Sequence, residues 1–408
     1  MAAAHGRKRI CRFLTTAGNA RRSLRIMLAE PKVLIDATAV PADRGGVGRY
    51  VDALIAALDA DGASLVVVCQ ARDEHFYGEI APNADVVAAP AAIARPPVRL
   101  AWEQVGFPRL IAKLGVDVVH SPHYTMPLAA KAASVVTLHD ATFFTEPVLH
   151  SAVKVRFFRA WTSISVRRAD GCVVPSEATA RELAAVADAD LGRLAVIPHG
   201  VDTDSFHPPS DEEVRQARAA AGLGEQPYVA FLGALEPRKN VPALIRGFVQ
   251  AVRDRPDPPA LVLAGPPGWD DRIAKALAVV PPHVRVIRAG YLPYRCLAGY
   301  LGGAELVVYP SLGEGFGLPV LEAMACGACV LTTRRLALPE VGGDAVAYCG
   351  VGAGDVAAAL AELLDDPGRR AELAAAAVLR AKEFSWRASA QRHRDVYERA
   401  ARARSRSR

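Results

Sequence analysis

The chain has 408 residues, 51% hydrophobic and 23% charged, which excludes an intrinsically disordered protein and exceeds what one ordinary core requires. The formal charge of +6 lies at the ends: residues 1–30 hold seven Lys/Arg and one acid, residues 401–408 hold four Arg, and 38 basic and 42 acidic residues remain between them. Because nucleic-acid-binding domains carry basic residues as a patch on the folded body, this distribution argues against a nucleic-acid partner.

Residues 1–30 show no periodic pattern, and we expect a flexible basic extension there. Their apolar segment is short and is broken by Arg12, which argues against a secretory signal. No uninterrupted apolar run reaches the ~18 residues of a membrane span. Seven cysteines scattered through apolar stretches are typical of reduced core residues, including the C-x-x-C of Cys326 and Cys329. These features favour a cytoplasmic protein.

Strand-like runs alternate with helical patterns in the first half of the chain. Several runs consist of Val, Ile and Leu without polar alternation, which is typical of strands buried on both faces of a parallel sheet. We expect an N-terminal domain over residues 31–202. Its expected strands are Lys32–Ala37, Ser64–Cys69, Asp85–Ala89, Val116–His120, Ser134–His139, Gly171–Pro175 and Leu194–Pro198.

The polar segment 202–210 lacks periodicity and is interpreted as an interdomain linker. A second domain is expected over residues 203–380. Two successive series of alternating strands and helices predict an α/β protein with two Rossmann-like, doubly wound domains that face each other across a cleft. Ligands are expected at the carboxyl ends of the strands. The second set of expected strands is Tyr228–Leu232, Ala260–Ala264, Val284–Ile287, Leu306–Tyr309, Cys329–Thr332 and Ala345–Tyr348.

A glycine-rich loop with two carboxylates follows the strand that ends at Tyr309. The sequence Gly-Glu-Gly-Phe-Gly-Leu-Pro-Val-Leu-Glu over residues 313–322 predicts a loop and then a helix that opens near Pro319. Glycines allow close backbone approach, and a helix N-terminus offers N–H groups to phosphate oxygens. Glu314 and Glu322 can each accept bonds from two hydroxyls, which suits a sugar or a ribose.

Two cations follow the first strand of the same domain. Arg238 and Lys239 lie at a strand-to-helix turn, beside the positive end of the helix that Asn240 is expected to cap. Such charges fit a bound diphosphate, for which Arg supplies a fork and Lys a point charge. The alternative is a solvated basic turn.

Two features of the first domain suggest a ligand site. Gly45 and Gly46 lie in a glycine-rich turn after the first strand. This turn lacks the third glycine of a dinucleotide fingerprint, which disfavours an NAD-dependent oxidoreductase. His139 ends a later strand and lies at the carboxyl edge of the predicted sheet, where both a structural and a functional role are open.

A basic helix is expected over residues 151–168, which contain five Lys/Arg and no acid. Val153, Phe157, Trp161 and Ile164 form a stripe at helical spacing. Such a helix can lie on an anionic membrane surface, or it can be a core helix with a basic outer face.

Five motifs in order give the chain a family resemblance: GGVGRY, TLHD, VIPHGVD, FLGALEPRKN and GEGFGLPVLEAMACG. Together they resemble the retaining GT-B glycosyltransferases of family four, over about residues 31–400. The G-x-L-E-P-R-K-N form is most similar to the mannosyltransferases of surface-polysaccharide assembly. Many members carry an Arg where this chain has Ala234, which leaves more of the phosphate charge to Arg238 and Lys239.

The resemblance implies a role for each matched residue. Glu314 would hold donor-sugar hydroxyls, Glu322 the nucleotide ribose, and Arg238 with Lys239 the diphosphate. His139 would lie near the reacting carbon. The backbone of Phe316, Gly317 and Leu318 would meet sugar and phosphate, and Gly45 with Gly46 would close over the ligands.

Beyond the second domain, the resemblance implies a terminal helix over residues 381–400 that crosses back to the first domain. The Arg/Ser tail 401–408 is expected to be disordered and to add to attraction toward an anionic surface.

The expected activity is transfer of a hexose, first of all mannose from GDP-mannose, to a glycan or lipid-linked acceptor with retention of configuration. The alternatives are a glucosyl- or rhamnosyltransferase using a UDP- or dTDP-sugar, and a non-catalytic glycan- or nucleotide-binding protein. No cofactor or metal is expected, because the three D-x-D pairs are interpreted as turn acids: Asp59/Asp61, Asp188/Asp190 and Asp202/Asp204. We expect a cytoplasmic location, and a peripheral position at the inner face of the membrane is open.

Overall fold

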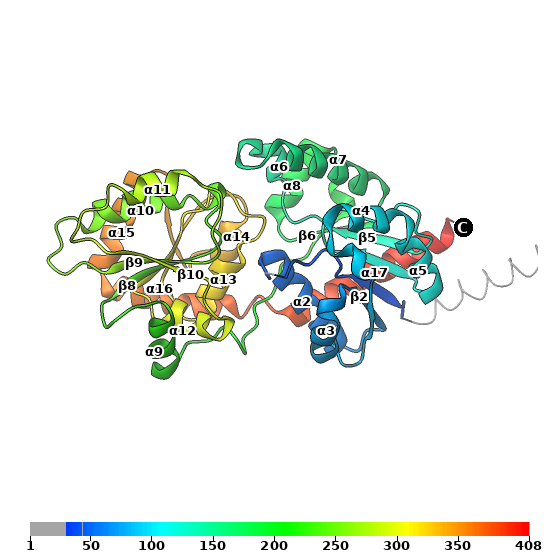
Figure 1. The fold of residues 1–408 in the computed structure, drawn as a ribbon, viewed down its shortest axis with the longest axis horizontal. Helices are drawn as coiled ribbons and strands as arrows, with labels where there is room; N and C mark the ends of the chain where they lie inside the picture. The colour runs from blue at the N-terminus through cyan, green and yellow to red at the C-terminus, as the bar shows by residue number, and fades with distance from the viewer. Residues whose placement is uncertain (1–29, 43, 408) are drawn as a thin grey trace, which may run out of the picture.

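The computed structural model describes residues 30–42 and 44–407, so the expected extension lies outside the described residues apart from Glu30. The chain forms two α/β domains, which lie side by side in Figure 1. Each contains a parallel sheet with helices on both faces, as the unbroken apolar strand runs predict. The predicted fold class is therefore confirmed.

The N-terminal domain contains a seven-stranded parallel sheet in the order β3-β2-β1-β4-β5-β6-β7. The central strands are buried along their whole length because helices cover both faces. The strands are β1 (Val33–Asp36), β2 (Leu65–Cys69), β3 (Asp85–Ala88), β4 (Val118–Ser121), β5 (Ala133–Thr137), β6 (Gly171–Val174) and β7 (Leu194–Val196). The helices are α2 (Gly46–Ala60), α3 (Glu74–Ile80), α4 (Pro96–Val105), α5 (Phe107–Leu114), α6 (Thr142–Thr145), α7 (Ala152–Arg168) and α8 (Glu177–Ala187).

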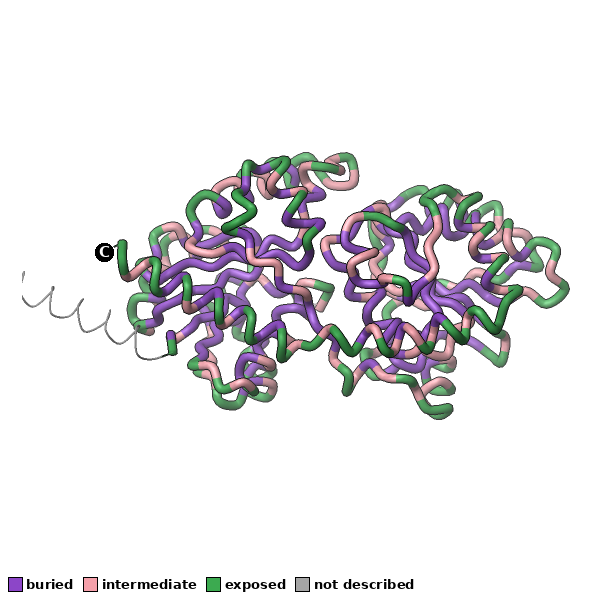
Figure 2. The backbone as a smooth tube through the Cα atoms, turned by 180° about the vertical axis from the view of Figure 1, so that it is seen from behind, coloured by how far each residue is buried: buried purple, intermediate pink, exposed green. Residues whose placement is uncertain are grey.

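The C-terminal domain contains a six-stranded parallel sheet in the order β10-β9-β8-β11-β12-β13. Figure 2 shows its strands buried and its outer helices exposed along one side. The strands are β8 (Tyr228–Leu232), β9 (Ala260–Ala264), β10 (Val286–Gly290), β11 (Leu306–Tyr309), β12 (Val330–Thr333) and β13 (Ala347–Cys349). The helices are α9 (Asp211–Ala220), α10 (Val241–Val252), α11 (Arg272–Leu277), α12 (Leu297–Gly302), α13 (Leu318–Ala325), α14 (Leu338–Gly342), α15 (Ala353–Asp365) and α16 (Pro367–Ala381).

The last helix, α17 (Trp386–Arg406), crosses back and packs beside α2 on the N-terminal domain (Figure 1). It buries Val396, Tyr397 and Ala400 in the core of that domain. The expectation of a disordered tail from residue 401 is wrong: the helix continues to Arg406, because Ala401 is buried and Arg404 donates a hydrogen bond to the carbonyl oxygen of Ala130 at 3.2 Å.

The two chain segments that join the domains touch each other. Val201 forms a parallel bridge with Ser385, and its N–H donates to the carbonyl oxygen of Phe384 at 3.1 Å. A Cβ at Gly200 would overlap the backbone of Trp386, so this contact requires glycine. Within the described ranges, no helix has both the length and the hydropathy needed to cross a membrane.

Candidate active site

A cleft of about 330 Å³ lies between the domains, and its walls are loops that follow strands of both sheets. This is the position that the doubly wound topology predicts for a ligand. The sequence-predicted residues that line it are Gly45, Gly46, His139, Arg238, Lys239, Glu314, Phe316, Gly317 and Leu318. Glu322 lies one turn further along α13, behind the cleft wall.

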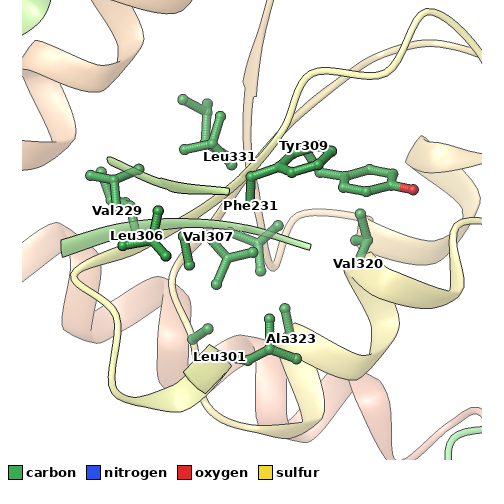
Figure 3. Close-up of a cluster of buried hydrophobic side chains, with 14 of the residues drawn as sticks. Val229, Phe231, Leu301, Leu306, Val307, Tyr309, Val320, Ala323 and Leu331 are labelled. Carbon is green, nitrogen blue, oxygen red and sulfur yellow. The ribbon is translucent and has the colours of Figure 1, made fainter. Parts of the chain in front are cut away.

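The loop after β11 positions the N-terminus of α13 at the cleft. Gly317 precedes the helix with φ of +107°, a backbone conformation that favours glycine, and Pro319 lies in the first turn as predicted. Figure 3 shows Val320 and Ala323 of α13 near Val307 of β11, so a packed core fixes the helix against the sheet. The packed core thus holds the first N–H groups of α13 in place at the cleft.

Glu314 is buried between Arg238 and Lys239. Lys239 Nζ donates to Oε1 of Glu314 at 2.7 Å, Ser311 Oγ donates to the same oxygen at 2.8 Å, and Arg238 Nη1 donates to Oε2. Lys239 also donates to the Tyr309 hydroxyl. The carboxylate of Glu314 therefore fixes the position of both cations. The family resemblance implies a sugar-binding role for Glu314 and does not predict this second role.

The charges of this cluster shift each other's ionisation. Burial alone would raise the pKa of Glu314, but Arg238, Lys239 and two hydrogen bonds lower it to about 2. Burial and then the charge of Arg238 lower the pKa of Lys239 to about 8, and Glu314 offsets part of this effect. Glu314 is thus ionised at neutral pH, whereas Lys239 loses its charge as pH rises through about 8.

The neighbouring turn departs from one expectation. Asn240 precedes α10, but its side chain does not cap the helix. It adopts the left-handed conformation and donates from Nδ2 to the carbonyl oxygens of Val351 at 2.9 Å and Pro310 at 3.3 Å. Asn240 therefore ties the turn that carries both cations to the loop after β11.

Glu322 is buried and forms an ion pair across the domain interface. Arg49 of α2 donates from Nη1 to Oε1 of Glu322 at 2.6 Å. Burial raises the pKa of Glu322, and Arg49 counteracts that shift. The sequence did not indicate this pairing.

The glycine turn before α2 leaves open space at the cleft. A Cβ at Gly45 or Gly46 would meet no atom within 4 Å, so packing does not require these glycines. No described side chain caps the N-terminus of α2, and its first N–H groups remain available to a ligand.

His139 is a neutral imidazole at the cleft wall. Its Nε2 lies 2.7 Å from the carbonyl oxygen of Pro122 and must donate, since a carbonyl only accepts. Burial lowers the pKa of His139. His199, which follows β7, lines the same cleft and has ring contacts to Tyr50 at 4.6 Å and Phe316 at 4.8 Å. Burial also lowers the pKa of His199 well below its ordinary value, so the two histidines form an uncharged surface beside the cations.

The loop after β11 also holds the domains together. The carbonyl oxygen of Gly315 accepts from Ser176 Oγ at 2.7 Å and Thr179 Oγ1 at 3.2 Å, both in the N-terminal domain. A Cβ at Gly315 would overlap the carbonyl oxygen of His139. Glu340 of α14 accepts from the first two N–H groups of α8 at 2.9 and 2.7 Å. These contacts define a closed arrangement of the cleft.

Three residues at the site were not singled out in the sequence. Arg49 and His199 lie within the GGVGRY and VIPHGVD motifs, and Tyr309 ends the strand before the glycine loop. The sequence feature that could have identified them is their position, at the carboxyl end of a strand or at the start of the helix that follows. Their partners lie far away in sequence, which hid the contacts.

Several of the D-x-D aspartates make structural contacts, among them Asp61, which forms an ion pair with Arg394 of α17. Asp59 accepts from the N–H and side chain of Asn83, and Asp190 accepts from the N–H of Gly192. None of the six lines the cleft. In the part of the chain that the structure describes, no group of three or more His, Cys, Asp or Glu is placed to hold a metal ion. Metal independence stays a prediction.

Helix α7 buries a different face from the expected stripe. Val153 is 79% exposed, and Phe157, Trp161 and Ile164 are half-buried. The buried residues are Val155, Thr162, Ser165 and Val166. The aromatic edge therefore remains accessible, and membrane contact stays a prediction.

Cys326 and Cys329 are free and buried. Burial raises the pKa of Cys329 to about 11 and also raises the pKa of Cys326. Neither thiol is a ready thiolate, in agreement with a packing role.

Comparison with known proteins identifies both halves of the chain. Residues 44–205 match the family described as Glycosyltransferase Family 4, and residues 214–380 match Glycosyl transferases group 1. An O-antigen chain mannosyltransferase B of Escherichia coli is 30% identical over 271 residues, covering 66% of this chain and 71% of the relative. A D-inositol 3-phosphate glycosyltransferase 2 of Catenulispora acidiphila is 32% identical, covering 57% of each chain.

Solved structures share the fold. A sucrose-phosphate synthase from Thermosynechococcus elongatus matches with a TM-score of 0.70 and 22% identity, covering 90% of this chain and 98% of that one. WaaG, a glycosyltransferase of lipopolysaccharide biosynthesis, matches with a TM-score of 0.68 and 16% identity, covering 89% and 99%. The two matched halves and the paired sheets show that the chain belongs to glycosyltransferase family 4 and has the GT-B fold.

Proposed function

We propose that the protein is a retaining hexosyltransferase that moves mannose from GDP-mannose to a glycan or lipid-linked acceptor. The observation that carries the proposal is the cluster of Glu314, Arg238 and Lys239 at the cleft, beside the N-terminus of α13. Fixed cations and helix N–H groups at one place suit a diphosphate.

The chemistry follows from these charges. When the bond between sugar and diphosphate breaks, a further negative charge develops on the leaving oxygen. Arg238 and Lys239 would face that charge in a partly dehydrated cleft, where preorganised donors act strongly. Departing phosphate would help to deprotonate the acceptor hydroxyl on the same face, so no protein nucleophile is needed. Neutral His139 would lie beside the sugar without adding charge.

The choice of mannose rests on one relative. The Escherichia coli relative is described as an O-antigen chain mannosyltransferase, and it is covered over 71% of its length. Others are described as D-inositol 3-phosphate glycosyltransferases. HepE of Anabaena, with a TM-score of 0.67 and 18% identity, binds UDP-glucose. UDP- and dTDP-sugars therefore stay alternative donors.

The decisive experiment is a donor panel with the full chain. GDP-mannose, UDP-glucose and dTDP-rhamnose are incubated without acceptor, and release of the nucleoside diphosphate is measured. We expect slow hydrolysis of GDP-mannose. Preferred hydrolysis of another donor would replace mannose, and binding without hydrolysis of any donor would favour a non-catalytic binding protein.

Anomeric configuration needs a separate measurement. With an acceptor that supports transfer, the NMR spectrum of the product gives the configuration of the new linkage. We expect the configuration of the donor to be kept. An inverted product would refute the retaining mechanism while leaving the donor assignment intact.

We further propose that the enzyme is metal-independent and works in the cytoplasm, at the inner face of the membrane. The basic surface and the accessible aromatic edge of α7 support a peripheral position. Addition of EDTA should leave the transfer rate unchanged. Loss of activity on chelation, with recovery on adding Mg²⁺ or Mn²⁺, would refute metal independence.

A further inference from the structure

Arg49 reaches from the N-terminal domain to a carboxylate of the C-terminal domain. It lies in the first turn of α2 and lines the cleft, and its Nη1 donates to Glu322 Oε1 at 2.6 Å. The side chains of the pair are 22% and 5% exposed. The pair therefore lies inside the interface, between the cleft and the core of α13.

Each partner keeps one buried polar atom without a hydrogen bond to the described residues. These atoms are Nε of Arg49, a donor, and Oε2 of Glu322, an acceptor. Buried polar atoms are normally satisfied, so two unpartnered atoms beside a cleft point to a polar group of a ligand as their partner. A hydroxyl fits both atoms, because it donates one bond and accepts others.

We propose that Arg49 is a binding residue of the nucleotide site and that it completes a ribose-hydroxyl pocket with Glu322 when the domains are together. This inference rests on the proposed function, in which the sugar nucleotide places its ribose at Glu322. Glu322 Oε2 accepts from the ribose 2′-hydroxyl, and Arg49 Nε donates to it. The pocket thereby selects ribonucleotide donors over 2′-deoxyribonucleotide donors.

Other ion pairs across the interface lack these features. Arg181 and Glu340 lie 3.6 Å apart, and the Arg181 side chain is 69% exposed. Arg335 and Glu146 lie 3.5 Å apart and are also solvent-accessible. Neither pair contains a buried atom without a partner. Arg181 therefore provides a matched control for loss of an interdomain arginine.

The test measures binding of GDP, 2′-deoxy-GDP, UDP and 2′-deoxy-UDP by calorimetry. The wild-type protein should bind the preferred ribonucleotide about 10-fold or more tightly than its deoxy form, since a site built for a hydroxyl rejects the analogue that lacks it. Arg49→Met should weaken the ribonucleotide about 10-fold and the deoxy form much less, which brings their affinity ratio close to one. Arg49→Lys, which keeps the charge, should give an intermediate ratio.

Three outcomes separate this inference from the proposed function. Arg181→Met should keep the wild-type ratio of ribonucleotide to deoxyribonucleotide affinity. If Arg181→Met brings this ratio as close to one as Arg49→Met does, domain closure alone is responsible and the inference is overturned. An Arg49→Met variant that melts like wild type and keeps the wild-type ratio would also overturn it, with the proposed function intact. A wild-type protein that binds none of the four nucleotides would overturn both. If Arg49→Met does not fold, the comparison of wild type with Arg49→Lys decides: an intermediate affinity ratio in Arg49→Lys supports the inference, and an unchanged ratio overturns it.

Discussion

Arg238 and Lys239 share Glu314 as a partner, and the activity of variants measures what each cation contributes. Lys239→Ala and Arg238→Ala should each lower kcat by about 10²–10³, the usual cost of removing one preorganised donor. KM for the donor should rise less, because the charge on the leaving oxygen develops only in the transition state. Steady-state kinetics with the preferred donor provide the measurement.

The matched control for this prediction is Arg215→Ala, which removes an exposed arginine paired with Glu212 on α9. Its kinetics should equal those of wild type. A rise in KM with unchanged kcat in the cation variants would mean that the two residues bind ground and transition states alike.

The pH dependence of kcat/KM should report Lys239. Burial and Arg238 lower the pKa of Lys239 to about 8, so its charged, donor-binding form is lost as pH rises through about 8. We expect kcat/KM to fall there and kcat to fall at higher pH, because a bound diphosphate favours the charged amine. Glu314 does not change the pH profile of kcat/KM near neutral pH, since its pKa is held at about 2. Lys239→Arg should remove the alkaline limb, and a flat wild-type profile to pH 10 would contradict this assignment.

At the scale of one element, α7 should bind anionic vesicles. Its four exposed basic residues, Lys154, Arg156, Arg167 and Arg168, each add about 1 kcal/mol of attraction near an anionic surface, and salt screens this attraction. Sedimentation with phosphatidylglycerol vesicles should show binding that weakens with salt, and replacing Lys154 and Arg156 by Ala should reduce it. Both residues are exposed, so their loss leaves the core intact. Equal binding to neutral vesicles, or none to either, would reject the electrostatic contact.

The strands were predictable because their signal is local. Apolar runs, several of them made of Val, Ile and Leu, predicted all thirteen described strands, and the bounds of β8, β9 and β11 agree with those expected. The glycine loop was also predictable, since Gly317 and Pro319 mark where a helix can begin. Local propensity and backbone geometry carry these features, so one sequence is enough to find them.

The remaining features depend on contacts between distant residues. Arg49 and Glu322 meet only because two domains face each other, and Lys239 meets Tyr309 only because β8 and β11 are neighbours in the sheet. The tail 401–406 has the composition of a disordered segment, yet a buried alanine face holds it in a helix. In each case tertiary packing overrides what the local sequence indicates.

At the scale of the whole molecule, Gly315→Ala should prevent the closed arrangement. The added Cβ would overlap the His139 carbonyl, whereas each domain keeps its own core. We expect kcat/KM to fall on the order of 10²-fold, since small misplacements of reacting groups have effects of this size. Small-angle scattering with bound nucleotide should show a larger radius of gyration than for wild type.

The control is Gly224→Ala, at a glycine where a Cβ would meet no atom within 4 Å. It should match wild type in both measurements. Wild-type activity and wild-type scattering in Gly315→Ala would show that catalysis does not use the closed arrangement.

The crossing of α17 has a consequence for how the protein is made. The ribosome completes strands β1–β7 early, but α17, which packs against β4, β5 and β6, follows only after the entire C-terminal domain. Until then Tyr50 lacks its hydrogen bond to His393, and His120 lacks its hydrogen bond to Tyr397. The first domain to be synthesised is therefore the last to be completed, and a nascent chain stalled before α17 exposes an unfinished apolar face to chaperones.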